Sequence, residues 1–80
     1  MPHSIVLDVP ESILSAVRRG FRRVLILEET DAVADVLSGP QPARVDLVAP
    51  AGRLSVRCTG VVHGRVAGRR AWCVGLGGRA

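Results

Sequence analysis

The opening of the chain constrains the fold more than any other segment. It indicates an apolar strand over Ser4–Val9, a helix over Pro10–Arg19 and a second apolar strand over Arg22–Glu28. Proline suits the first position of a helix, where its missing N–H costs nothing. Gly20 follows the helix, in the place where a left-handed residue usually ends one. This tight strand–helix–strand order predicts an α+β domain.

Both apolar strands of this opening lack alternation. Ile5, Val6 and Leu7 are consecutive, and so are the residues of Val24–Leu27. The first run is typical of a buried central strand. The second indicates a strand that is either buried on both faces or covered on one face by the helix.

The middle of the chain predicts a short helix and then a hairpin. Thr30 can cap a helix over Asp31–Leu37, and the segment 38–42, rich in proline and glycine, ends it. From Ala43 onward apolar and polar residues alternate, which is typical of strands with one buried face. Ala49–Gly52 has the composition of a four-residue hairpin connection.

The alternation also fixes a register for this hairpin. If Val48 pairs with Arg53, the apolar side chains of the two strands face one another. Asp46 then lies on the outer face, diagonally between Arg53 and Arg57. We expect this one carboxylate to neutralise part of the charge of both arginines.

The last third predicts a strand with a turn over Gly60–Gly68 and a closing strand over Arg70–Leu76. Three nearby glycines predict a flexible tail over 76–80. We expect residues 1–80 to form a single domain, because this length leaves no room for a second. The predicted class is therefore α+β, with a small, mostly antiparallel, β-barrel-like sheet and one main helix.

Positive charge gathers in the second half of the chain. Residues 1–40 hold four arginines and six acids, a net charge of −2, whereas residues 41–80 hold seven arginines and one acid, a net charge of +6. A basic half favours an anionic partner such as nucleic acid, although a solvated arginine-rich surface has the same composition.

Two groups of arginines are candidate nucleic-acid-binding residues. The first surrounds Gly20 and comprises Arg18, Arg19, Arg22 and Arg23. The second, Arg69 and Arg70, lies beside Trp72. Arginines next to an exposed aromatic ring can hold phosphates while the ring stacks on a base. Alternatively, Trp72 anchors the core as the largest apolar side chain.

The sequence predicts no catalytic site, no metal site and no cofactor. Zinc could draw on His3, Cys58, His63 and Cys73, but no two of them have the close spacing of zinc motifs. His63 with Cys58 is the least unfavourable nucleophile–base pair, yet residues 53–80 contain no acid. We expect the two cysteines to be small buried side chains rather than a disulfide framework.

The first apolar run is too short for a signal peptide, and no apolar run approaches the length of a membrane span. Two cysteines without a disulfide pattern fit a reducing compartment. We therefore expect a cytoplasmic protein that does not contact a membrane. The sequence leaves its oligomeric state open.

Several segments follow the order of a known family. His3–Glu11, Val17–Gly20 and the strand from Arg22 form its opening, while Arg44–Val48 and Trp72–Leu76 lie where its later strands would fall. In this order the chain resembles the short bacterial and phage members of the ASCH group in the PUA-like superfamily. The resemblance implies a small β-barrel and recognition of RNA or other nucleic acid in the cleft between helix and barrel.

Some small members of that group are amidohydrolases acting on modified nucleosides, with a GKxxxExR-like pattern after the glycine. Here Leu25 and Leu27 stand where Glu and Arg are expected, and the chain has no lysine. We therefore expect non-catalytic binding of nucleic acid, RNA above all. The alternative is an interaction protein, for instance a phage accessory factor, whose arginines meet an acidic protein surface and which exposes an apolar patch.

Overall fold

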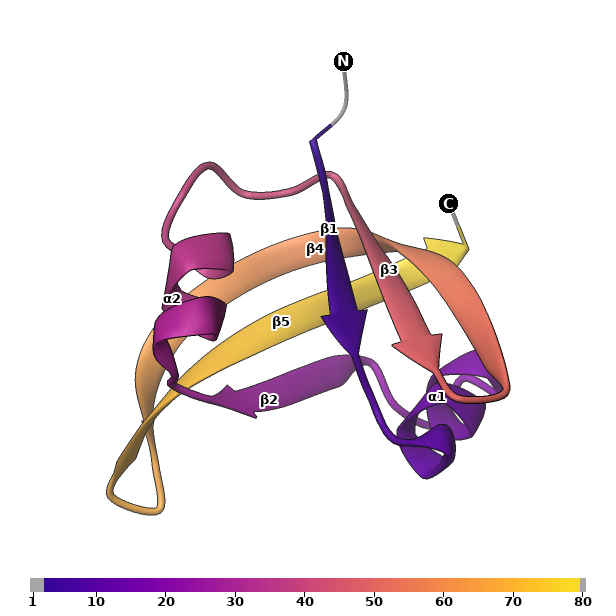
Figure 1. Ribbon diagram of the computed structural model, residues 1–80, viewed down its shortest axis with the longest axis horizontal. Coiled ribbons are helices and arrows are strands. Elements are labelled where there is room, and N and C mark those ends of the chain that lie inside the picture. Colours follow the sequence, from indigo (N-terminus) through magenta and orange to yellow (C-terminus); the bar gives the residue numbers. More distant parts are fainter. Residues whose placement is uncertain (1–2, 80) are drawn as a thin grey trace.

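The computed structural model describes residues 3–79, in which two helices accompany a mixed five-stranded sheet (Figure 1). The elements are β1 (Ser4–Asp8), α1 (Glu11–Arg18), β2 (Val24–Glu28), α2 (Asp31–Leu37), β3 (Arg44–Ala49), β4 (Gly52–Val66) and β5 (Arg69–Arg79). The predicted α+β class and both predicted helices are confirmed. Pro10, expected as the first helical residue, has an extended backbone and precedes α1 as its N-cap.

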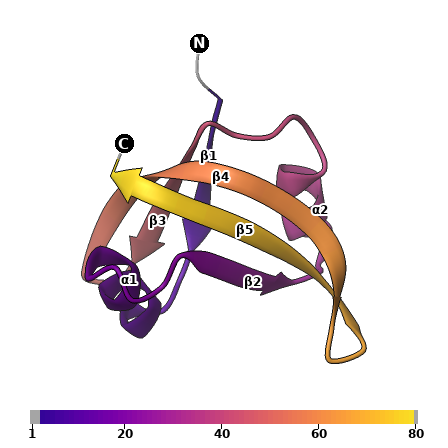
Figure 2. The ribbon, with the colours of Figure 1, turned by 180° about the vertical axis from the view of Figure 1, so that it is seen from behind.

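The sheet has the strand order β1-β3-β4-β5-β2, so that β1 and β2 form its two edges. β1 is parallel to β3, and the other three pairings are antiparallel. The long strands β4 and β5 arch side by side across the molecule (Figures 1 and 2). The sheet is thus mostly antiparallel, as predicted, but it is open and does not close into a barrel.

The prediction of a buried central strand for the first apolar run is wrong. β1 is an edge strand, and its Val6 is 57% exposed. β2 is the other edge strand and exposes Val24 and Ile26. The exposed apolar residues of both strands, Val6, Val24 and Ile26, are β-branched, and β-branched side chains fit the pleated surface of a strand. Their composition therefore resembles that of a buried strand.

The β3–β4 hairpin has the predicted register. Val48 pairs with Arg53, and Leu47 lies opposite Leu54. Ala49 and Gly52, expected in the connection, form the last pair of the ladder. The alternation of side chains was therefore sufficient to align these two strands.

Asp46 does not have the surroundings expected from that register. Its side chain is buried, accepts a hydrogen bond from the hydroxyl of Ser55 and lies 3.5 Å from Arg44 Nε. The expected neutralisation of Arg53 and Arg57 is therefore corrected. Asp46 bonds to the residue directly opposite and to the arginine two positions earlier on its own strand.

All seven helices and strands contribute to one aliphatic core. Its buried side chains are Ile5, Leu7, Val9, Leu14, Val17, Leu25, Leu37, Val45, Leu47, Ala49, Val56, Val74 and Leu76. α2 begins at its predicted cap, because the Thr30 hydroxyl accepts a hydrogen bond from the Val33 amide at 3.2 Å. Within residues 3–79, neither helix has the length and apolar character needed to cross a membrane.

The predicted flexible tail over 76–80 is wrong for its described part, while Ala80 lies outside the described residues. β5 continues to Arg79, and Leu76 is buried in the core. The Leu76 amide donates a hydrogen bond to the Arg23 carbonyl at 2.7 Å, which ties this end of β5 to the approach to β2.

Close packing, rather than flexibility, accounts for Gly75 and Gly77 in β5. The pairing of β4 with β5 is irregular between Val56 and Gly60. A Cβ at Gly75 would collide with the hydroxyl of Thr59, and one at Gly77 would lie 3.2 Å from the Thr59 methyl group. These glycines let β5 approach the irregular part of β4.

Candidate functional site

The end of α1 places three arginines around one turn of backbone. Arg18 ends the helix, and Gly20 follows with φ of 79°, the left-handed conformation common after a helix. The Gly20 amide donates a hydrogen bond to the Val17 carbonyl at 3.0 Å. Arg22 and Arg23 then lead directly into β2. Since glycine adopts this conformation without steric cost, the turn fixes where these arginines leave the backbone.

α1 is held against the β3–β4 hairpin along its length. Leu14 is buried in the core, and the Glu11 carboxylate accepts a hydrogen bond from the Ala51 amide in the hairpin turn. Arg18 passes beside Gly52, where a Cβ would lie 3.5 Å from the guanidinium. The last turn of α1 therefore forms a wall next to the start of β4.

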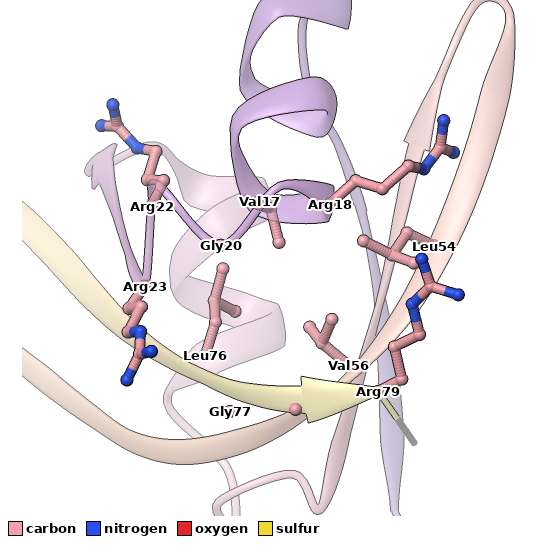
Figure 3. A pocket seen from close by; sticks show the side chains of 11 residues that line it. Val17, Arg18, Gly20, Arg22, Arg23, Leu54, Val56, Leu76, Gly77 and Arg79 are labelled. Atoms are coloured by element: carbon pink, nitrogen blue, oxygen red, sulfur yellow. The ribbon is translucent and has the colours of Figure 1, made fainter.

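A hollow of about 300 Å³ lies between the end of α1, the approach to β2 and the strands β4 and β5 (Figure 3). Its apolar lining is Val17, Leu54, Val56 and Leu76. Three glycines, Gly20, Gly77 and Gly78, also line it. The remaining lining residues are Arg18, Arg22, Arg23 and Arg79. We call this site the arginine hollow.

The four arginines stand in two pairs on opposite sides of the hollow. Figure 3 shows Arg18 and Arg79 on one side, Arg22 and Arg23 on the other, and apolar side chains between them. None of the lining residues is acidic, and none of these four arginines takes part in the ion pairs found within residues 3–79. The Arg22 Nε group donates to the Val24 carbonyl at 3.2 Å, which orients that guanidinium. Among the described residues, no carboxylate therefore offsets the positive charge of the hollow.

The second predicted group, Arg69 and Arg70, lies at the turn of the β4–β5 hairpin and is paired with acids. Arg69 Nη1 is 3.2 Å from a carboxylate oxygen of Glu28, and Arg70 Nη1 is 3.9 Å from one of Glu29. Such exposed pairs add little to stability. They do offset the positive charge, so this group differs from the arginine hollow.

Trp72 stacks on His63, its cross-strand neighbour, with ring centroids 4.3 Å apart and planes 18° apart. The indole packs against the core, and its buried Nε1 has no hydrogen-bond partner among the described residues. His63 Nε2 lies 2.9 Å from a carboxylate oxygen of Glu29. These are the contacts of a side chain that anchors the inner face of the hairpin.

The structure therefore brings together three of the first four predicted arginines. Arg19 is exposed but does not line the hollow. Arg79 lines it and was not predicted, because residues 76–80 were interpreted as a tail. A signal was present, since Val74 and Leu76 continue the strand period of two towards the end of the chain.

The two cysteines lie on opposite faces of the sheet and are free. Cys58 pairs with Leu76, which points into the core, whereas Cys73 pairs with the exposed Ile26 and Val62. Residues 3–79 contain no group of three or more histidine, cysteine and acidic side chains that could hold a metal ion.

The outer face of the sheet carries a short row of apolar residues. Ile26, Cys73 and Val62 are direct neighbours across β2, β5 and β4. Ile26 is 49% and Val62 is 65% exposed, and Val24 next to them is 46% exposed. We call Val24, Ile26, Val62 and Cys73 the outer apolar row.

No protein-family model matches the chain, and no curated protein or solved structure shows significant similarity to it.

Proposed function

We propose that this protein binds single-stranded nucleic acid, RNA above all, through the arginine hollow. The observation that carries the proposal is the placing of Arg18, Arg22, Arg23 and Arg79 around one hollow that no acidic residue lines. Guanidinium groups bind phosphates through paired charge-assisted hydrogen bonds. Apolar side chains between them offer a surface to sugars and bases.

We propose that this binding does not involve catalysis. The best nucleophile–base candidates, Cys58 and His63, are five residues apart on β4, which at about 3.3 Å per residue places them far beyond hydrogen-bond reach. The Cys58 thiol instead faces the Gly60 carbonyl, at 3.6 Å.

We also propose a PUA-like arrangement, although the sheet is open. The curved, mostly antiparallel sheet, with α1 beside one end of β4 and β5, supports it. The resemblance to that superfamily implies RNA or other nucleic acid as the ligand. We propose the cytoplasm as the location, because two cysteines without a disulfide pattern fit a reducing compartment.

Salt-dependent binding tests the proposal directly. Fluorescent single-stranded RNA, single-stranded DNA and duplex DNA are titrated with the protein between low and physiological salt. We expect micromolar or tighter binding of single strands that weakens steeply with salt, because phosphate contacts release counterions. Absence of binding at low salt would contradict the proposal.

Paired charge variants locate the site. Arg22→Gln with Arg23→Gln removes two guanidiniums of the hollow, whereas Arg69→Gln with Arg70→Gln removes two that are already paired with acids. Both double variants change the net charge equally. We expect the first to weaken binding of every sequence and to reduce the salt slope by about one unit per lost phosphate contact, and the second to have a clearly smaller effect. Equal losses would assign the binding to net charge instead.

A second function, docking on a protein with an acidic surface, is favoured by the outer apolar row. Exposed apolar residues that adjoin one another often mark protein interfaces. Under this function the wild-type protein would not bind single-stranded RNA. The substitutions Ile26→Ser and Val62→Ser would abolish docking on the partner protein. Retained RNA binding by these variants would support the arginine hollow instead.

A further inference from the structure

The arginine hollow has two charged sides and an uncharged centre. Arg18 and Arg79 stand on one side, and Arg22 and Arg23 stand on the other (Figure 3). Each pair supplies enough donors for one phosphate, since a single guanidinium already binds a phosphate through two parallel hydrogen bonds. One small anion lying at either pair would leave the opposite pair without a partner. The arrangement therefore suits a ligand with two separate anionic groups.

The centre of the hollow suits an uncharged ring system. Its side chains there are aliphatic: Val17, Leu54, Val56 and Leu76. The volume of about 300 Å³ lies at the lower limit of small-molecule sites. A space of this size accepts one nucleoside, whereas a duplex cannot enter it.

No side chain that lines the hollow can accept a hydrogen bond from a base. Apart from the guanidiniums, its lining has no acidic, amide or hydroxyl side chain. Phosphate contacts position a nucleic acid, whereas base-edge contacts specify its sequence. With the guanidiniums bound to the two phosphates, occupancy of the hollow should depend on these phosphates and on the apolar contact, with little dependence on which base is present.

We infer that the arginine hollow holds one nucleoside unit together with the phosphates on its 5′ and 3′ sides. This inference rests on the proposed function and names the part of the nucleic acid that the hollow holds. The smallest free molecule that contains one nucleoside and both phosphates is a nucleoside 3′,5′-bisphosphate. A nucleoside 5′-monophosphate has the same ring system but engages only one pair of arginines.

The first experiment measures binding of adenosine 3′,5′-bisphosphate and of adenosine 5′-monophosphate to the full chain by calorimetry at low salt. We expect the bisphosphate to bind about tenfold or more tightly, because a second phosphate adds charge-assisted hydrogen bonds. It should also displace fluorescent single-stranded RNA. Equal affinity of the two nucleotides would overturn the inference.

A second experiment fills the hollow without changing its charge. Gly78 lies on the same face of β5 as Leu76, and a Cβ there would meet nothing within 4 Å. Gly64 in β4 has equally open surroundings but does not line the hollow. We expect Gly78→Leu to lower the affinity for the bisphosphate about tenfold, with an unchanged Tm, and Gly64→Leu to bind normally. Normal binding by Gly78→Leu would overturn the inference.

The outcomes separate the inference from the proposed function. Steeply salt-dependent RNA binding that Gly78→Leu leaves intact would overturn the inference alone, since phosphate contact would then occur without the hollow. Binding of the bisphosphate without binding of RNA would support the hollow as a nucleotide site and overturn the nucleic-acid function. Absence of binding by RNA and by both nucleotides would overturn both.

Discussion

Ala67 is the one non-glycine residue among those described that has a positive φ. Its φ is 52°, and Gly68 follows with φ of 79°, so both central residues of the β4–β5 turn are left-handed. This turn type suits the twist of a hairpin, but it favours asparagine followed by glycine. Alanine in the left-handed conformation costs about 1 kcal/mol. We therefore expect Ala67→Asn to raise the free energy of unfolding by about that amount, measured by urea denaturation.

Ala51 provides the matched control for this substitution. It lies in the turn of the β3–β4 hairpin and is exposed, but its φ is not positive. Ala51→Asn should leave the free energy of unfolding unchanged. A gain from both substitutions would show that asparagine stabilises through solvation and not through the backbone conformation at residue 67.

Trp72 has an unusual combination of contacts, with a stacked ring and an unpaired donor. Its indole stacks on His63, yet the buried Nε1 has no partner among the described residues. A buried donor without a partner costs about 1–3 kcal/mol. Trp72→Phe removes that donor and keeps an aromatic ring, so its free energy of unfolding should stay within about 1 kcal/mol of wild type. Trp72→Ala should lose about 3 kcal/mol.

The comparison of these two variants identifies the role of Nε1. If Trp72→Phe were as destabilising as Trp72→Ala in thermal and urea unfolding, the N–H would have a hydrogen bond in solution. A loss confined to Trp72→Ala would show that ring packing is the contribution that matters.

At the scale of elements, the close approach of β5 to β4 depends on glycine. A Cβ at Gly75 would collide with Thr59, whereas a Cβ at Gly64 would meet nothing. Gly75→Ala should therefore lower the free energy of unfolding by about 1–3 kcal/mol, the usual cost of forcing extra volume into a packed site. Gly64→Ala, also in a strand, should be neutral or slightly stabilising. Equal effects in urea denaturation would indicate that strand propensity, and not the collision, decides.

The elements that the sequence predicted well are those with local signals. Three local signals lie within a few residues of what they determine. They are Pro10 and Gly20 on either side of α1, the Thr30 cap of α2, and the alternation on both sides of the β3–β4 turn. The position of a strand in the sheet is not local. β1 and β2 are edge strands because β4 pairs with both β3 and β5, which leaves only the outer sides of β3 and β5 for them. No apolar run in β1 or β2 reveals this.

The candidate site was partly predictable for the same reason. Arg18, Arg22 and Arg23 adjoin one helix stop, so their proximity follows from the sequence. Arg79 reaches the hollow only through the pairing of β5 with β4, where it lies opposite Val56. The acids that offset Arg69 and Arg70 come from the end of β2 and the residue after it, about 40 positions earlier in the chain. The spacing of residues along the sequence therefore predicts neither the position of Arg79 nor the ion pairs of Arg69 and Arg70.

At the scale of the whole molecule, positive charge is unevenly compensated. The net charge is +4. Within residues 3–79, three arginines outside the hollow form ion pairs with carboxylates, while eight form none, and four of these eight line the arginine hollow. Like charges gathered on one surface repel one another and lower the stability of the folded state. An anion bound in the hollow would relieve this repulsion, which links ligand binding to stability.

Thermal unfolding in phosphate tests that link. Any ligand that binds only the folded state raises its stability as the free ligand exceeds the Kd, and in a domain of this size each 1 kcal/mol gained shifts Tm by about 4–8 °C. We expect millimolar phosphate to raise Tm above the value in chloride of equal ionic strength.

Phosphate also stabilises proteins generally by exclusion from their surface, and the double variant Arg22→Gln/Arg23→Gln shares that general effect. The phosphate-dependent rise should therefore be smaller in this variant, whereas Arg69→Gln/Arg70→Gln should keep the full rise, because its arginines are already paired with Glu28 and Glu29. An equal rise in all three proteins would show that phosphate acts through exclusion alone and that the arginines of the hollow do not bind it.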